Sequence, residues 1–197
     1  MYDKQLNYKF NQMKLNSKKN VGSLMEEIRK CDPSTVEEWK EYYYNNVRTV
    51  RKINNLAKKL ADETIESLDI CREYINICII QRTFDGYMRE MKMIDKINEA
   101  IGEKVVHNDF PPEWDSQYRI DAILETENGR IGIQFKPASY LTQYYDNSRQ
   151  YDKRAWTQAQ MDRIVIEVIL IVDRNAEMED GIKQIKEYLA LDKCREM

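Results

Sequence analysis

The sequence predicts a mixed fold of the α+β or α/β class, in which a helical first half precedes a mixed sheet flanked by helices. Two stretches, 118–126 and 130–136, alternate apolar and polar residues on either side of Asn128-Gly129, which is a strong signal for a β-hairpin. A nearly continuous β-branched run over 164–172 predicts a buried central strand. Helical spacing of apolar residues governs most of the chain before Gly102.

Helices are expected throughout the first half. Ser34 and Glu37 have the spacing of a capping box. The apolar stripe of one later helix is most simply explained as core and contains Leu68, Cys71, Ile75, Cys78 and Ile79. Gly102 suits the C-cap of the last of these helices. The expected helices cover 3–16, 21–31, 34–46, 48–61, 63–81 and 83–101. We expect one compact domain, with a helical N-terminal region at 1–81 and a core at 82–197.

The hairpin turn predicts which side chains share a face of the sheet. If Glu127 faces Arg130 across the turn, counting back pairs Asp121 with Lys136. Directly opposed residues lie on the same face, so Asp121, Gln134 and Lys136 form one polar cluster. The opposite, core-facing side is expected to hold Ile120, Ala122, Leu124, Ile131, Ile133 and Phe135.

An acid, an amide and a lysine on one face are the groups that metal-dependent phosphodiester hydrolysis requires. A divalent cation neutralises the phosphate and makes a nucleophile from water near neutral pH. Mg²⁺ prefers oxygen ligands, which Asp121, Gln134 and the carbonyl of Phe135 would supply, and Mn²⁺ would substitute for it. Lys136 would orient the attacking water and stabilise negative charge. The alternative is an ordinary cross-strand ion pair between Asp121 and Lys136, worth about 0.5 kcal/mol.

The pattern D-x12-Q-x-K on paired strands resembles the PD-(D/E)xK nuclease motif. Ile120 stands where that motif often has proline, and Gln134 replaces the second acid, which is a known variant. The resemblance implies a PD-(D/E)xK restriction-endonuclease-like core behind the helical N-terminal half. It also implies a glutamate on the first core helix, four residues after a glycine, and Glu90 follows Gly86 with that spacing. The alternative for Glu90 is an ordinary surface position.

More specifically, the chain resembles the MjaI-type restriction endonucleases, which recognise CTAG. The resemblance rests on NVGSLMEEI at 20–28, VEEWKEYYY at 36–44, RTFDGYMRE at 82–90, and the segments IDAIL and IGIQFKP, all in the family's order. It implies a type II enzyme that makes Mg²⁺-dependent double-strand cuts at a short palindrome. A twofold homodimer acting on double-stranded DNA is then expected. A cognate DNA methyltransferase would be its functional partner.

Composition excludes several other classes of protein. The four cysteines lack paired CxxC spacing, which argues against zinc and for a reducing cytoplasm. A mechanism of the Ser-His-Asp type would depend on His107, the only histidine, which has no nucleophile motif beside it. The six glycines form no phosphate-binding loop. Neither a signal peptide nor a long apolar run is present, so a cytoplasmic protein without a membrane span is expected.

A net charge of −3 argues against a generic nucleic-acid binder, so the placement of the 31 basic residues matters. Residues 141–163 follow the hairpin and mix basic, aromatic and amide side chains, which suit phosphates and base edges. The candidate DNA contacts there are Gln143, Tyr144, Arg149, Lys153, Arg154, Trp156 and Gln158. Lys18 and Lys19 form a second basic patch. The alternatives are an amphipathic helix that packs Trp156 on the core and a solvated loop at the patch.

The remaining elements complete the prediction. A loop at 105–117 leads into the hairpin, and its Glu113 and Asp115 would lie near a metal. Helices are expected over 148–162 and 177–193. Two other functions stay open: a structure-specific repair or junction nuclease with the same metal site, and a non-catalytic helical binding or regulatory module.

Overall fold

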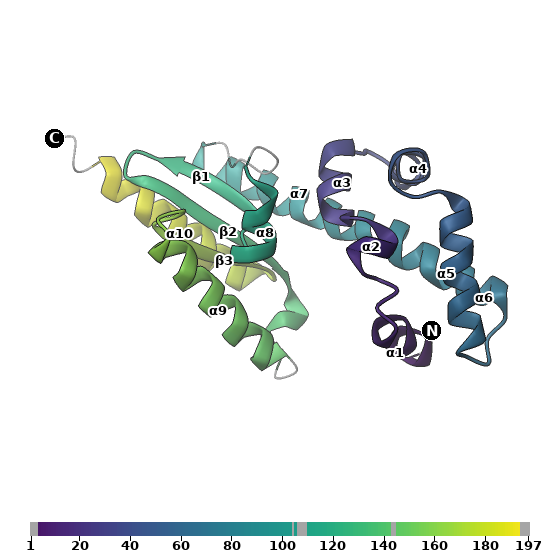
Figure 1. The fold of residues 1–197 in the computed structure, drawn as a ribbon. Coiled ribbons are helices and arrows are strands. Elements are labelled where there is room, and N and C mark those ends of the chain that lie inside the picture. The colour runs from purple at the N-terminus through teal and green to yellow at the C-terminus, as the bar shows by residue number, and fades with distance from the viewer. Residues whose placement is uncertain (1–3, 104, 106–109, 143–144, 194–197) are drawn as a thin grey trace. The chain divides into compact units, whose positions relative to one another are not determined.

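The computed structural model describes residues 4–103, 105, 110–142 and 145–193. By its internal contacts the chain divides into two compact units, residues 1–89 and 90–197. The long helix α7 (Arg82–Ile101) runs across the boundary between them. Figure 1 labels the elements of both units.

The first unit is helical and is built around buried aromatic residues. Trp39 and Tyr43 are fully buried. The Trp39 indole N–H donates to the carbonyl of Ile79 at 3.1 Å, and the Tyr43 hydroxyl donates to the carbonyl of Val21 at 2.9 Å. The elements before α7 are α1 (Lys4–Gln12), α2 (Lys18–Val21), α3 (Leu24–Cys31), α4 (Val36–Tyr42), the π-helical turn η1 (Tyr43–Val47), α5 (Val50–Asp62), α6 (Leu68–Asn76) and the π-helical turn η2 (Ile77–Gln81).

Two details of this unit differ from the sequence prediction. The capping box of α4 begins one residue later than predicted, at Thr35, whose hydroxyl accepts from the backbone N–H of Glu38 at 3.2 Å. The Glu38 carboxylate accepts in return from the Thr35 backbone N–H. Both Ser34 and Thr35 are N-cap residue types, so spacing alone did not separate them. Leu68, predicted to be core, is 40% exposed at the start of α6.

A three-stranded mixed sheet organises the second unit. Its strands are β1 (Ala122–Thr126), β2 (Gly129–Pro137) and β3 (Glu167–Asp173), in the order β1-β2-β3. The β1-β2 pair is antiparallel and the β2-β3 pair is parallel. The β-branched run predicted to be the central strand is therefore wrongly placed, because β2 lies between the other two. The other elements are α8 (Pro112–Tyr118), the 3-10 turn η3 (Ala138–Leu141), α9 (Asp146–Met161) and α10 (Asn175–Lys193).

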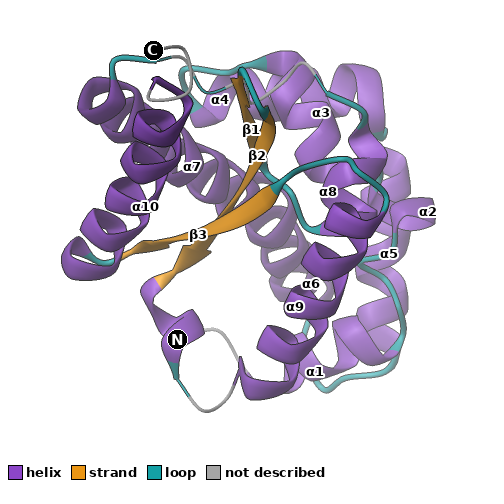
Figure 2. Cartoon of the chain, turned by 90° about the vertical axis from the view of Figure 1, so that its left-hand side faces the viewer, coloured by secondary structure: helices purple, strands orange, loops and turns teal. Residues whose placement is uncertain are grey.

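Helices cover both faces of this sheet, as Figure 2 shows. On one face, Ile133, Phe135 and Ile171 pack with side chains of α7 and α10 in one hydrophobic cluster. On the other face, Ile123 and Val168 pack with residues of α8 and α9 in a second cluster. This two-sided cover explains why β3 reads as a continuous apolar run although it lies beside only one strand in the sheet.

The predicted hairpin register is wrong because the turn begins one residue earlier than predicted, but the predicted faces of the strands are mostly right. Thr126 pairs with Gly129, so Glu127 and Asn128 form the turn and Gly129 takes the positive φ of +135°. Ile123 consequently pairs with Gly132 and not with Gln134. The slip moves every partner by two positions. Because side chains alternate with a period of two, an even slip leaves each side chain on its predicted face.

One member of the predicted core face is misplaced. Ile120 lies between α8 and β1, and it packs in the second cluster with Ile123 rather than with Ala122 and Leu124. The segment predicted as a loop contains the short helix α8, which begins at its second proline. Arg119 then takes a left-handed conformation with φ +59°, which breaks the alternation before the strand begins.

Candidate active site

Asp121 lies directly before β1 and is held against β2 by its own backbone and side chain. Its backbone N–H donates to the carbonyl of Ile133 at 2.9 Å. Its carboxylate accepts a hydrogen bond of 2.8 Å from the backbone N–H of Phe135. Since Ala122 pairs with Ile133 and the Asp121 N–H also donates to the Ile133 carbonyl, Asp121 and Ala122 both lie opposite Ile133, so Asp121 is not opposite Lys136 as predicted. The Asp121 side chain is therefore fixed at the edge of β2 with 9% of the residue exposed.

Gln134, the residue before Phe135 on β2, is the second predicted metal ligand. It is 2% exposed, and its Oε1 atom is buried without a hydrogen-bond donor among the described residues. Leaving a buried acceptor unsatisfied costs about 1–3 kcal/mol. A buried acceptor without a donor is a group that a bound cation would satisfy.

The backbone of Phe135 adds a third oxygen at the same edge. In a strand, the N–H and the C=O of one residue point to the same side. Because the Phe135 N–H points to Asp121, its carbonyl also faces the side on which Asp121 lies. The β1-β2 ladder ends at the pair of Ala122 and Ile133, so the Phe135 carbonyl lies beyond the paired part of β1.

Lys136 leads from this edge to a buried acid that the sequence prediction missed. Its ammonium lies 3.2 Å from Oδ2 of Asp152, which comes from α9. The Tyr140 hydroxyl donates to the same oxygen at 2.8 Å, and the Lys136 ammonium lies 5.1 Å from the centre of the Tyr140 ring. The Arg119 Nε atom lies 3.9 Å from the other oxygen, Oδ1. Asp152 is only 4% exposed and joins a strand, a turn and the end of a helix.

Tyr140 acts in this group as a hydrogen-bond donor. Burial raises the pKa of its hydroxyl, and the hydrogen bond to Asp152 raises that pKa further. The hydroxyl therefore keeps its proton and acts as the donor in the hydrogen bond to Asp152.

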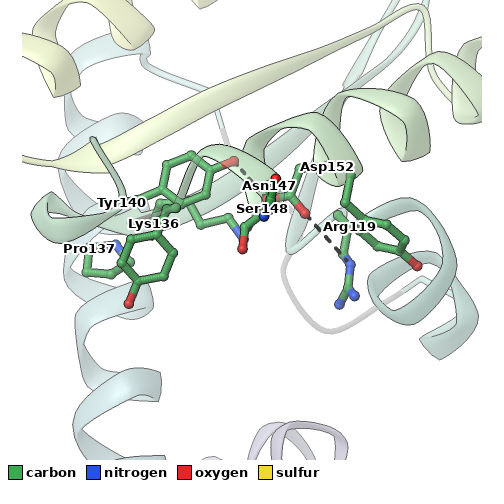
Figure 3. A pocket seen from close by; sticks show the side chains of 9 residues that line it. Arg119, Lys136, Pro137, Tyr140, Asn147, Ser148 and Asp152 are labelled. Carbon is green, nitrogen blue, oxygen red and sulfur yellow. Dashed lines mark hydrogen bonds and ion pairs between the residues drawn. The ribbon is translucent and has the colours of Figure 1, made fainter. Parts of the chain in front are cut away.

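A pocket of about 500 Å³ opens where these side chains meet, and Figure 3 shows how they lie around it. Lys136 and Pro137 come from the end of β2, Tyr140 from η3, and Arg119 from the residue after α8. The lining residues are Arg119, Lys136, Pro137, Tyr140, Tyr145, Asn147, Ser148, Tyr151 and Asp152. Two cations, one buried anion and three tyrosine rings suit a ligand that carries both a phosphate and flat apolar surface.

Asp152 was missed because it stands among basic residues and looks like part of a charged surface. Its spacing carries a signal, however. Asp152, Trp156 and Ala159 recur at helical intervals, and this stripe of α9 faces the core. An acid within an otherwise apolar stripe indicates a buried carboxylate that requires partners.

The other predicted site residues lie in varied places. Glu90 lies partly buried on α7, at the first residue of the second unit and one turn before the core residues Met93 and Ile94. Asp115 is partly buried on α8. The predicted contacts Gln143 and Tyr144, as well as His107, lie outside the described residues.

Some of the predicted DNA contacts on α9 are exposed, and others interact with residues of the protein itself. Lys153 and Arg154 are exposed. Arg149 donates to the carbonyls of Tyr140 at 2.6 Å and Thr142 at 3.0 Å, and it pairs with Asp146.

The remaining predicted DNA contacts are likewise either held within the protein or exposed. Trp156 packs against the second hydrophobic cluster, which was the alternative considered for it. Gln158 donates to Asp162 at 2.8 Å. In the first unit, Lys18 and Lys19 are exposed on α2.

The metal-binding capacity of the described residues is limited to sites of low charge. Nowhere in the described parts of the chain do three or more His, Cys, Asp or Glu side chains gather in a way that would hold a metal ion. The predicted donors are one carboxylate, one amide and one backbone carbonyl. That set fits a hard cation that keeps several waters, such as Mg²⁺.

Together, a helix-rich chain, a small mixed sheet, and a polar edge with an acid, an amide and a lysine fit an α+β fold of the nuclease type. A family model described as "MjaI restriction endonuclease" matches residues 3–183. Since this match covers most of the chain, the protein belongs to the MjaI restriction endonuclease family.

One curated relative gives the same indication over a shorter span. The "Type II restriction enzyme MjaI" of Methanocaldococcus jannaschii is 25% identical over 130 residues, which are 62% of this chain and 57% of that protein. The match thus spans little more than half the length of the relative. No solved structure matches the chain. None of the helices in the described ranges has both the length and the apolar character needed to cross a membrane.

Proposed function

We propose that this protein is a type II restriction endonuclease that makes Mg²⁺-dependent double-strand cuts in DNA at a short palindrome. Membership of the MjaI restriction endonuclease family supports the class of enzyme. The observation that carries the site is the buried Gln134 Oε1 atom, which has no hydrogen-bond donor among the described residues and belongs to the residue before Phe135, whose N–H holds the Asp121 carboxylate. CTAG is the recognition sequence that the family resemblance suggests.

The sheet provides the support for a PD-(D/E)xK core. Asp121 precedes one strand, Gln134 and Lys136 share the facing strand, and helices lie on both sides of the sheet. Gln134 takes the place of the second acid. The core in this proposal therefore carries one fewer negative charge than a site with two acids.

Asp121, Gln134 and the Phe135 carbonyl would hold a Mg²⁺ ion. When bound, the cation neutralises phosphate charge and lowers the pKa of a coordinated water. Two contacts keep the protein ligands in place before binding. The Phe135 N–H fixes the Asp121 carboxylate, and pairing of β2 with β3 fixes the backbone of Gln134 and Phe135.

In this proposal, Lys136 binds the phosphate of the bond that is cut. Its ammonium lies at the pocket and is anchored by Asp152, so a phosphate in that pocket meets a cation already in position. Glu90 on α7 remains the proposed additional acid of the catalytic site. The exposed Lys153 and Arg154 would contact the backbone of duplex DNA.

The assembly follows from the symmetry of the substrate. A palindrome offers two equivalent strands, and a twofold homodimer brings one active site to each. A host that makes such an enzyme needs a methyltransferase that protects the same sequence in its own DNA. The homodimer and the protecting methyltransferase are both part of the proposal.

Digestion of unmethylated phage DNA tests this function. Purified wild-type protein is compared with Lys136→Ala, with Mg²⁺ and with EDTA, and sequencing of the fragment ends identifies the site. Lys183→Ala is the matched control, because Lys183 is exposed on α10 and its ammonium lies 4.0 Å from Glu187. Discrete fragments that require Mg²⁺, disappear in Lys136→Ala and persist in Lys183→Ala would support the proposal.

Two outcomes would contradict it. Intact DNA under every condition, in a protein shown to be folded, would leave the non-catalytic binding module. Cleavage of branched or damaged DNA but not of intact duplex would replace a restriction enzyme by a structure-specific nuclease.

A further inference from the structure

The buried carboxylate of Asp152 has more partners than the packing of α9 requires. Its Oδ2 atom accepts from the Tyr140 hydroxyl at 2.8 Å and lies 3.2 Å from the Lys136 ammonium. Its Oδ1 atom lies 3.9 Å from Arg119 Nε, an atom that is itself buried without a hydrogen-bond acceptor. Three chain segments therefore converge on one side chain that is 4% exposed.

Burial of a carboxylate is costly unless its partners are well placed, so this arrangement needs a reason. A helix that only had to pack would place an apolar residue here, as α9 does with Ala159 on the same stripe. The common feature of the partners is their position around the pocket at the end of β2 (Figure 3). Lys136 is the partner to which the proposed function gives a chemical role.

We propose that Asp152 is a positioning residue for Lys136, resting on the proposed function of that lysine. Lysine has a flexible stem and loses rotamer entropy when it is fixed. Asp152 meets this cost before DNA binds, because it holds the ammonium at the pocket. Tyr140 holds the acceptor in turn, since its hydroxyl shares the oxygen that faces Lys136.

The arrangement also sets the charge of the pocket. Arg119 and Lys136 carry two positive charges, and Asp152 carries one negative charge. Replacement of Asp152 by asparagine removes that negative charge while it keeps the shape of the side chain. The pocket should then attract a phosphate more strongly but hold Lys136 less firmly. Opposite changes in DNA affinity and in cleavage rate are therefore expected from one substitution.

The chain offers a matched control at the end of the same helix. Asp162 follows α9 and accepts a hydrogen bond from the Tyr118 hydroxyl at 2.7 Å, so it repeats the Asp-Tyr contact away from Lys136. The test set is Asp152→Asn, Asp152→Glu and Tyr140→Phe, with Asp162→Asn and Tyr118→Phe as controls.

Three measurements on the full chain separate positioning from a purely structural role. The first is the single-turnover rate of cleavage with Mg²⁺. The second is the dissociation constant for duplex DNA in EDTA, where no cleavage occurs. The third needs no activity: ¹⁵N relaxation of the Lys136 ammonium reports how firmly it is held, and its signal is assigned by its loss in Lys136→Arg.

We expect Asp152→Asn to cleave about 10–100-fold more slowly, as misplacement of a catalytic group does. It should bind DNA about 2–5-fold more tightly, because one negative charge near the phosphate is gone. The Lys136 signal should broaden or show faster motion. Asp152→Glu should restore part of the rate, Tyr140→Phe should lose about 3-fold in rate, and both controls should match the wild type.

Several results would overturn the inference. If Asp152→Asn folds poorly, Tyr140→Phe decides through the Lys136 relaxation measurement. Unchanged Lys136 motion in a folded variant would show that Asp152 does not hold the lysine. Equal losses of DNA affinity and cleavage rate would show a structural role only. If Lys136 becomes mobile in the variants but the wild type cuts no DNA, the positioning stands and the proposed function fails.

Discussion

Replacement of Gln134 by leucine should make the metal-free protein more stable and abolish its response to metal. The Gln134 Oε1 atom is buried without a donor, and the residue is 2% exposed. An unsatisfied buried acceptor costs about 1–3 kcal/mol, and an apolar side chain of similar size removes that cost. Gln134→Leu should therefore raise the free energy of unfolding in EDTA by about 1–3 kcal/mol.

Metal binding should reduce or reverse this difference in stability between the wild type and Gln134→Leu. A ligand at 100 times its dissociation constant stabilises the folded state by about 2.7 kcal/mol. Mn²⁺ should stabilise the wild type by about that amount and leave Gln134→Leu unchanged, so the difference in stability shrinks or changes sign. Urea denaturation followed by tryptophan fluorescence, in EDTA and in Mn²⁺, measures both effects.

Gln160→Leu is the control for this experiment. The Gln160 amide donates to the Glu167 carboxylate at 3.1 Å, so its replacement should lower the free energy of unfolding by about 0.5–1.5 kcal/mol in both conditions. The reasoning would be refuted if Gln134→Leu were destabilising in EDTA, or if Mn²⁺ stabilised Gln134→Leu as much as the wild type.

Further substitutions test other features of the protein. Arg149→Ala should lower the free energy of unfolding by about 1.5–3 kcal/mol in a urea melt, because its guanidinium donates to two backbone carbonyls; an unchanged melt would assign Arg149 to DNA alone. Replacement of both Lys153 and Arg154 by alanine should reduce the salt dependence of DNA binding by about two phosphate contacts without changing stability, and an unchanged slope in a salt titration would contradict that. Gly181→Ala should cost about 1–3 kcal/mol, because its Cβ would lie 2.4 Å from the Ile171 side chain, whereas Gly86→Ala, with open space around it, should be neutral or slightly stabilising.

The faces of the hairpin could be predicted from the sequence although its register could not. Asn128-Gly129 correctly marked a turn, but only Gly129 takes a positive φ, so the turn begins one residue earlier than predicted. Alternation along each strand is a local property and survives an even slip. The pairing of Asp121 depends on the turn geometry, which the dipeptide alone did not determine.

The partner of Lys136 could not be predicted because it is a long-range contact. Lys136 and Asp152 come from different elements, and α9 brings them together by packing on the sheet. Patterns among neighbouring residues in the sequence do not reveal a contact between two separate elements. Ile120 was misplaced for a related reason, since the left-handed residue Arg119 resets the direction of the chain just before the strand.

Calorimetric titration of Mn²⁺ into the wild type and Asp121→Asn tests whether the Asp121 carboxylate holds a metal ion. The Asp121 carboxylate is the one charged ligand of the proposed metal site, and asparagine keeps an oxygen to accept from the Phe135 N–H, so the fold should persist. We expect a saturable binding heat in the wild type that is lost in Asp121→Asn and kept in Asp162→Asn. Equal binding heats in the wild type and Asp121→Asn, or no binding in a folded wild-type protein with DNA present, would contradict it.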